Sequence, residues 1–284
     1  MALSVNTNVG AMAALQSLTA TNKDLATTQT RINTGLNVSS TKDDSAKYTI
    51  AQKLRGDLGG LTAVSSSLST AKSTTDVAVD GAEQISDLIN QMKAKATEAS
   101  DSGITADSRT AIAKDFAALK DQISTIIDSS SFNGTNLLKA SGGAVSALQS
   151  TDPDADTLSV ANQDFGTNVL DVIGSTFGVD SSGAAVGADD ADAAKTMITT
   201  LETVAATVNT TLSTLGSASR KIDGQSTFVS KLSDTITGGI GNLVDADLAK
   251  ESAKLQALQV KQQLGVQALS IANQAPQTIT SLFR

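Results

Sequence analysis

The sequence predicts a mainly α-helical protein: a long coiled-coil helical bundle with a small β-rich hairpin region at its tip. Three observations predict this fold. Apolar residues follow heptad spacing over two long stretches, short apolar runs broken by turn residues separate these stretches, and both chain ends lack charge. With 40% hydrophobic residues but only 2% aromatics, the 284-residue chain favours thin layers of closely packed helices over a large globular core.

The first element is a helical tract within residues 1–42. Its first 22 residues carry no charged side chain. Apolar residues, among them Leu15, Leu18, Leu25 and Ile32, recur at helical spacing along the tract. Residues 1–10 lack the basic region of a Sec-type signal peptide, so we expect any export to use another route.

The middle bundle is predicted for residues 43–243, and it begins with an apolar seam over residues 61–99. At 1.5 Å per residue this seam is about 58 Å long. Its positions alternate in steps of three and four, and only Thr75 is polar: Leu61, Val64, Leu68, Ala71, Thr75, Ala78, Ala82, Ile85, Ile89, Met92, Ala96 and Ala99. After a break at residues 101–103, Ile112, Phe116, Leu119, Ile123 and Ile126 predict a shorter antiparallel partner.

A β-rich excursion is predicted for about residues 129–190, where turn signals separate short apolar runs. Asn133-Gly134 is typical of a tight hairpin, and residues 157–161 and 168–173 are candidate strands. A second long seam then covers residues 194–240 in alternating steps of four and three, and we expect it to end at Gly238 to Gly241. Its positions are Ala194, Ile198, Leu201, Ala205, Val208, Leu212, Leu215, Ser219, Ile222, Ser226, Val229, Ser233, Ile236 and Ile240.

The last element, residues 244–284, is a helical tract that carries no charge between residues 262 and 283. Its many amides, together with Asn273 and Pro276, make it too polar for a membrane span. Two apolar faces on one terminal helix exceed what a single partner within the chain can cover. Because chain ends normally fray, these ends predict self-association, and a head-to-tail contact builds a helical array unless it closes into a ring.

Composition excludes most enzyme classes. Without Cys or His the chain has no disulfide, no thiolate metal site and no histidine-based catalytic relay. The net charge of −8 and the scarcity of aromatics argue against nucleic-acid binding. Asp152, Asp154 and Asp156 have the spacing of a calcium loop, but Thr157 and Gln163 occupy its Gly and Glu positions. We therefore expect a solvated turn there, and a protein that is no enzyme and needs no cofactor or metal.

Several segments near the two ends resemble bacterial flagellin. The N-terminal ones are residues 31–36 (RINTGL), 40–46 (STKDDSA) and 50–51 (IA), and residues 132–134 (FNG) with 137–138 resemble the turn after the second core helix. The C-terminal ones are residues 245–251 (DADLAKE), 263–264, 269–274 (LSIANQ) and 281–284 (SLFR). They stand in the family's order and at the family's distances from the ends.

The resemblance implies a structural subunit that polymerises into the flagellar filament used for motility. In that family both termini pair into an inner helical layer, here residues 1–42 and 244–284, and the middle helices form the next shell. The chain is exported unfolded through the flagellar type III apparatus, with a chaperone, and adds beneath a cap. Its partners are copies of itself, the cap and the hook-junction proteins, and its location is extracellular. A hook–filament junction protein of the same superfamily is the alternative.

We expect the polymerisation interface to consist of large apolar residues on the two terminal tracts: Leu15, Leu18, Leu25, Ile32, Leu248, Leu255, Leu258, Leu264, Leu269 and Ile271. One strip departs from the family pattern. Many flagellins are detected by an innate immune receptor through a strip with two Arg and a Glu, and the matching residues here are Gln91, Met92, Lys93, Ala94 and Lys95. Because Gln91 and Ala94 replace the first Arg and the Glu, we expect weak detection.

Overall fold

The structure is a computed structural model, and it describes residues 7–152, 154–174, 177–179, 185–186 and 190–282. Five long helices dominate it: α1 (Val9–Thr34), α2 (Ser45–Ala99), α3 (Ala106–Ser129), α4 (Ala191–Val244) and α5 (Leu248–Leu282). The chain divides into two compact units, a terminal unit (Met1–Leu58 with Asp234–Arg284) and a middle unit (Gly59–Ser233). The mainly α-helical fold class is confirmed.

In the middle unit, α2 carries the predicted seam without exception. Every predicted position from Leu61 to Ala99 is buried, with exposed fractions between 0 and 5%. Thr75 is accommodated because its hydroxyl donates a 2.9 Å hydrogen bond to the Ala71 carbonyl of its own helix. The predicted break separates α2 from α3, where Arg109 is buried and donates to the Ala99 and Asp101 carbonyls.

The seam predicted for α4 is only partly correct. Ala194, Leu201, Val208, Leu215, Ile222 and Val229 are buried as predicted. Ile198, Ala205 and Leu212 are only half-buried, and the residue before each of them, Met197, Val204 or Thr211, is buried instead. At these steps two adjacent side chains compete for the seam, and heptad spacing alone does not select between them.

The glycines at 238–241 do not end α4, which continues to Val244. An interior glycine costs a helix about 1 kcal/mol relative to alanine, an amount that tertiary packing offsets. The helix ends where the Val244 carbonyl accepts hydrogen bonds from the backbone N–H groups of Asn37 (2.7 Å) and Val38 (3.2 Å).

The middle unit also contains part of the predicted β-rich excursion: the Asn-Gly turn and two pairs of short strands. Phe132 and Thr135 form a bridge around Asn133 (φ 49°) and Gly134 (φ 82°), which confirms the Asn-Gly turn. Strands β1 (Val145–Ala147) and β2 (Leu158–Val160) pair antiparallel, as do β3 (Gly178–Val179) and β4 (Ala185–Val186).

The strand predicted at residues 168–173 is wrong, because this segment falls in the π-helix η1 (Gly166–Asp171) and the turn of helix after it. Asp164 Oδ1 accepts a 3.0 Å hydrogen bond from the Thr167 N–H and so supports the start of this helix. Val169 and Ile173, four residues apart, are both fully buried, which is a helical and not a strand pattern.

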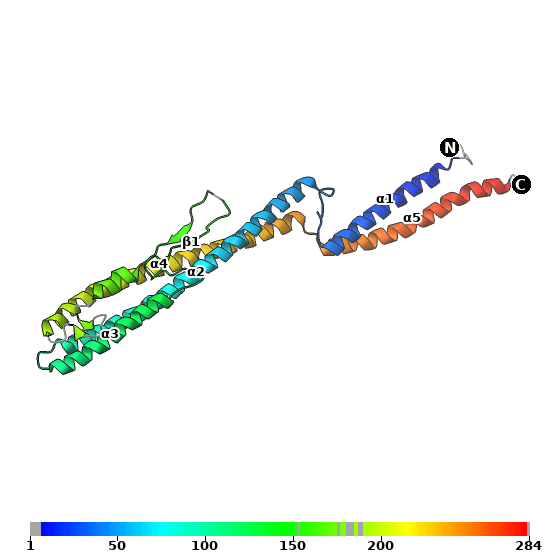
Figure 1. The fold of residues 1–284 in the computed structure, drawn as a ribbon. Coiled ribbons are helices and arrows are strands. Elements are labelled where there is room, and N and C mark those ends of the chain that lie inside the picture. The colour runs from blue at the N-terminus through cyan, green and yellow to red at the C-terminus, as the bar shows by residue number, and fades with distance from the viewer. Residues whose placement is uncertain (1–6, 153, 175–176, 180–184, 187–189, 283–284) are drawn as a thin grey trace. The chain divides into compact units, whose positions relative to one another are not determined.

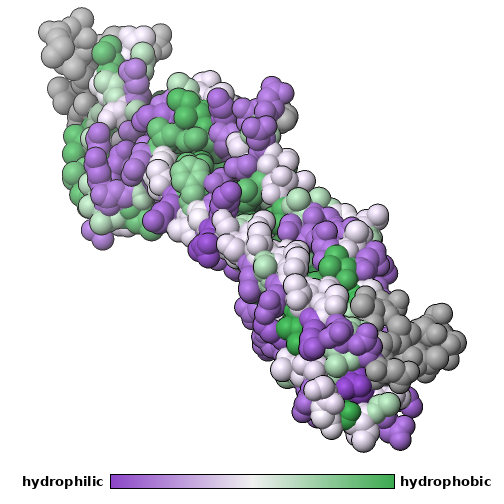
Figure 2. All heavy atoms as spheres, turned by 90° about the vertical axis from the view of Figure 1, so that its left-hand side faces the viewer, coloured by the Kyte–Doolittle hydropathy of each residue, from purple (hydrophilic) through white to green (hydrophobic). Residues whose placement is uncertain are grey.

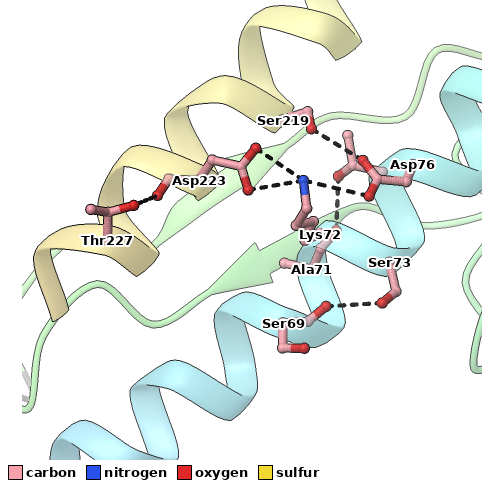
Figure 3. Close-up of polar contacts among 9 residues, drawn as sticks. Ser69, Ala71, Lys72, Ser73, Asp76, Ser219, Asp223 and Thr227 are labelled. Atoms are coloured by element: carbon pink, nitrogen blue, oxygen red, sulfur yellow. Dashed lines mark hydrogen bonds and ion pairs between the residues drawn. The ribbon is translucent and has the colours of Figure 1, made fainter. Parts of the chain in front are cut away.

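Polar side chains join α2 to α4 near the middle of the unit (Figure 3). Lys72 of α2 forms an ion pair with Asp223 of α4, and Ser219 donates a 3.1 Å hydrogen bond to Asp76. Farther along the same helices Lys93 pairs with Glu202 at 2.7 Å. These contacts place the two helices antiparallel.

In the terminal unit, α1 and α5 run side by side and antiparallel (Figure 1). Next to this pair, Leu36 and Asp245 form a β-bridge, and Val38, Ala51 and Val244 form a small buried cluster. The spatial division assigns residues 43–58 and 234–243 to this unit. The predicted assignment of residues 1–42 and 244–284 to an inner layer, with 43–243 as the middle shell, stays a prediction.

Candidate functional site

The α1–α5 pair buries mainly polar side chains between its helices. Among the described side chains, α1 buries Thr21 and Thr28, and α5 buries Glu251 and Leu258. Leu258 is therefore the one large apolar side chain that the described part of this pair encloses. Leu18, Leu25, Ile32, Leu255 and Leu269 are half-buried at the same contact, so the interior of this pair accounts for only part of its apolar residues.

The other apolar residues lie on the outside of the pair. Of the thirteen large hydrophobic side chains that are exposed in the described part of the chain, eight belong to α1 and α5, which shows where uncovered apolar surface concentrates. They are Val9, Met12, Leu15, Leu248, Val260, Leu264, Val266 and Ile271. Hydrophobic atoms form small groups among hydrophilic ones on the face drawn in Figure 2, without a single dominant patch.

A shallow groove follows one exposed stretch of α1. Its volume is about 540 Å³, and Met12, Leu15, Gln16, Thr19, Ala20 and Lys23 line it. Leu15 is 54% exposed and Met12 is 63% exposed. The groove combines exposed apolar side chains with the polar groups of Gln16, Thr19 and Lys23, so this surface is suited to contact with another polypeptide.

The ten residues predicted for the interface fall into three groups. Leu15, Leu248, Leu264 and Ile271 are exposed. Leu18, Leu25, Ile32, Leu255 and Leu269 are half-buried along the line where α1 meets α5, and Leu258 is buried there. Sequence reasoning left out Val9, Met12, Val260 and Val266, although the charge-free character of the tracts could have pointed to the first two and to Val266.

Polar contacts hold α1 against α5. Arg31 Nη1 lies 3.2 Å from Glu251 Oε1, Gln262 Nε2 donates to Asn22 Oδ1 at 2.8 Å, and Asn8 Nδ2 donates to the Ala272 carbonyl at 2.7 Å. Asn8 also caps α1, because its Oδ1 accepts from the Ala11 N–H at 3.0 Å.

The segment after α1 is ordered by a carboxylate. Asp43 Oδ2 accepts hydrogen bonds of 2.9 to 3.2 Å from the hydroxyls and backbone N–H groups of Ser39 and Ser40. The pKa of Asp43 lies below its ordinary value, because the Ser39 hydroxyl and then the neighbouring donors favour the ionised form.

The strip that departs from the family pattern lies on α2 beside α3. Met92 is fully buried, Lys93 pairs with Glu202, and Lys95 pairs with Asp115 at 3.0 Å. The hydrogen bond to Asp115 raises the pKa of Lys95. Gln91 and Ala94 are exposed and help to line a groove of about 450 Å³ between the two helices.

The described residues contain no group of three metal-ligating side chains. Among the helices within those residues, none is both long enough and apolar enough to cross a membrane.

Two family models match the chain. Residues 5–142 match the bacterial flagellin N-terminal helical region, and residues 198–283 match the bacterial flagellin C-terminal helical region. Flagellins FljM and FljK of Caulobacter vibrioides are each 45% identical to it, with alignments that cover 99% of this chain and 98% of theirs. A flagellin of Brucella melitensis is 36% identical over 99% of both chains.

These matches do not favour the hook–filament junction alternative, because the family models and the named relatives are flagellins. A flagellin is a structural protein, in agreement with the absence of thiol and imidazole groups from the sequence. The chain therefore belongs to the bacterial flagellin family and is a structural subunit of the flagellar filament.

Proposed function

We propose that this subunit polymerises through the outward apolar side chains of α1 and α5. In this proposal the paired terminal helices, residues 1–42 and 244–284, form the inner layer of the filament, and the helices of residues 43–243 form the shell around it. The single observation that supports it most directly is the uncovered apolar surface of the α1–α5 pair.

Burial of this surface supplies enough free energy for assembly. Each exposed Leu or Ile that a neighbour covers contributes about 1.5–3 kcal/mol. Leu15, Leu264 and Ile271 are more than half exposed, so most of that contribution is still available to an intermolecular contact. Residues on one copy that meet different residues on the next make a head-to-tail contact, which propagates as a helical array.

The route to the filament follows from the family. We propose that the chain leaves the cell unfolded through the flagellar type III export apparatus, with a chaperone, and adds beneath a cap above the hook-junction proteins. A sequence without Cys supports this route, because no disulfide can lock the chain in a folded form before export.

Paired substitutions on α5 test the proposal. Leu264→Ser with Ile271→Ser removes two outward apolar side chains, and Gln263→Ser with Gln267→Ser is the matched control on exposed positions of the same helix. We expect the first variant to raise the critical concentration for polymerisation by more than about tenfold, because the two side chains are 58% and 69% exposed and their loss removes at least about 2 kcal/mol per contact. The control is expected to polymerise like the wild type.

The readouts are sedimentation and negative-stain electron microscopy after seeding, with circular dichroism as a check on the fold. If the serine variant at 264 and 271 keeps its helical signal and still forms filaments at the wild-type concentration, the outward residues of α5 are not the assembly contacts.

A further inference from the structure

We propose that the Arg31–Glu251 ion pair sets the register in which α1 packs against α5, and so determines which apolar side chains the pair presents to neighbouring copies. This inference rests on the proposed function, because it concerns how the same surface is selected.

The heptad repeat of the α1–α5 contact does not by itself fix the register. Besides Arg31, the less exposed positions of α1 are Ala11, Ala14, Leu18, Thr21, Leu25, Thr28 and Ile32, and those of α5 are Glu251, Leu255, Leu258, Gln262, Gly265, Leu269 and Ala272. Both series alternate in steps of three and four. A slip of seven residues therefore brings side chains of similar size opposite one another, and apolar packing discriminates poorly between the two registers.

The Leu36–Asp245 bridge and the hydrogen bond from the Ala246 N–H to the Gly35 carbonyl hold one register at the end of the pair, and a buried ion pair next to them excludes the other registers. Arg31 Nη1 and Glu251 Oε1 meet at 3.2 Å, and the side chain of Glu251 is only 10% exposed. Arg31 Nε and Glu251 Oε2 are buried without a hydrogen-bond partner. Such a pair contributes little net stability, but separating its members leaves a buried charge without a counter-ion, which is strongly unfavourable.

A slip by one heptad is penalised in either direction. In one direction Glu251 moves from Arg31 to the position opposite Asp24, which brings two carboxylates together. In the other direction Arg31 comes to lie opposite the buried Leu258. The pair therefore acts by excluding the wrong registers, as a single polar residue does in the seam of a coiled coil.

Register has a direct consequence for assembly. A slip of seven residues is about 10 Å along the helix axis at 1.5 Å per residue. The apolar residues of α1, such as Leu15, would then be displaced by that distance from those of α5, such as Leu264. A neighbouring copy shaped to one arrangement would not fit the other.

The absence of Cys makes the register directly measurable, because disulfides form only between introduced residues. Asn22→Cys with Gln262→Cys reports the observed register, since these two side chains are in contact. Asn22→Cys with Leu255→Cys, or with Leu269→Cys, reports a slip of one heptad in either direction. Each reporter pair is placed in the full-length chain and oxidised before assembly, so that slipped chains are also detected.

We expect the otherwise wild-type chain to form the Asn22/Gln262 disulfide and little of the other two. Arg31→Met with Glu251→Leu keeps the bulk of both side chains, and it is expected to increase a slipped disulfide at least about tenfold. Arg31→Glu with Glu251→Arg, which restores an opposite-charge pair, is expected to return the observed register.

The inference is overturned if the Met/Leu variant assembles and forms only the in-register disulfide. If the Met/Leu variant does not assemble, the charge-swapped variant decides: in-register filaments support the inference, and a failure to assemble overturns it. A failure of the wild-type chain to polymerise, or normal polymerisation after Leu264→Ser with Ile271→Ser, would instead contradict the proposed function.

Discussion

Lys72 Nζ lies 2.8 Å from Asp223 Oδ1 and 3.0 Å from Asp223 Oδ2, so one lysine of α2 contacts both carboxylate oxygens of a residue on α4 (Figure 3). The same ammonium lies 3.6 Å from Asp76 Oδ2 on its own helix. The side chains of Lys72 and Asp223 are 40% and 53% exposed. This contact lies beside Thr75, the one polar residue of the α2 seam. The ion pair therefore links α2 to α4 at a level where the seam offers less apolar packing.

Alkaline pH should weaken this contact. The pKa of Lys72 is raised above its ordinary 10.5, first by the hydrogen bond to Asp223 and then by the charge of Asp76. Because the folded-state pKa is the higher one, the stabilisation is complete below about 10.5 and is lost as pH rises through the folded value. We expect Lys72→Met to remove about 0.2–1 kcal/mol at pH 8 and to reduce the loss of stability above pH 10.5.

Urea denaturation at pH 8 and pH 11 checks this expectation, with Lys114→Met, an exposed lysine of α3, as the control. An unchanged pH dependence in the Lys72 variant would show that the contact with Asp223 is not formed in solution.

The sequence predicted every seam position of α2 because the three–four spacing runs unbroken from Leu61 to Ala99, although Thr74 and Leu88 beside it are buried as well. It predicted α4 less well, since Met197 and Ile198 are both apolar and only tertiary packing decides which is buried. The segment around Val169 was misread because a short apolar run fits a strand and a helix equally. For the terminal pair, the two apolar faces predicted on the last helix are both present: Leu255, Leu258 and Leu269 lie toward α1, whereas Val260, Leu264 and Ile271 are exposed.

Position 142 requires a glycine because another part of the backbone approaches it closely, and not because of its own backbone angles. A Cβ at this position would lie 2.0 Å from the Asn136 carbonyl oxygen, a backbone atom that cannot move freely. Asn136 is itself fixed, because its Nδ2 donates to the Ile127 carbonyl at 2.6 Å and its Oδ1 accepts from Leu138 N–H at 2.9 Å. We expect Gly142→Ala to destabilise the protein by about 1–3 kcal/mol.

Gly238→Ala is the opposite case and serves as the comparison. Gly238 lies inside α4, and no atom lies within 4 Å of the position that its Cβ would take. Alanine there should stabilise the helix by about 0.5–1 kcal/mol. Denaturant midpoints of the two variants measure both effects, and a stabilised Gly142 variant would contradict the packing around Asn136.

The immune-receptor strip should be a poor ligand. Gln91 cannot form the two-pronged contact of an arginine, Ala94 offers no carboxylate, and Met92 is fully buried in the bundle. The two charges that remain, Lys93 and Lys95, already pair with Glu202 and Asp115. We expect a reporter-cell assay of the monomer to show little activation at nanomolar concentration.

Restoring the missing groups provides the counter-test. Gln91→Arg with Ala94→Glu should increase activation, whereas Gln84→Arg, a change of the same type at an exposed position of α2, should not. Full potency of the unmodified chain would show that the receptor does not depend on these positions.

Removing residues 245–284 should abolish assembly and leave the middle unit folded. The deletion removes α5 and with it Glu251, the ion-pair partner of Arg31. Most of the stability of a protein helix comes from tertiary packing, and α5 is the helix that packs along α1, so α1 should lose most of its helical structure. The α2 seam from Leu61 to Ala99 and its partners on α3 and α4 all precede the deletion, so their packing should persist.

Three measurements test the expected effects of this deletion. Sedimentation velocity should show a monomer, circular dichroism should show the loss of α1 and α5 alone, and limited proteolysis should cut first within residues 9–34. Because the truncated chain keeps Val9, Met12 and Leu15, it also tests whether the apolar residues of α1 can recruit neighbours alone. We expect that they cannot, since an unpaired α1 must pay its ordering entropy at the moment of contact. Filaments formed by the truncated chain would assign the assembly contacts to α1 or to the middle unit, and the outward residues of α5 would then serve some other contact.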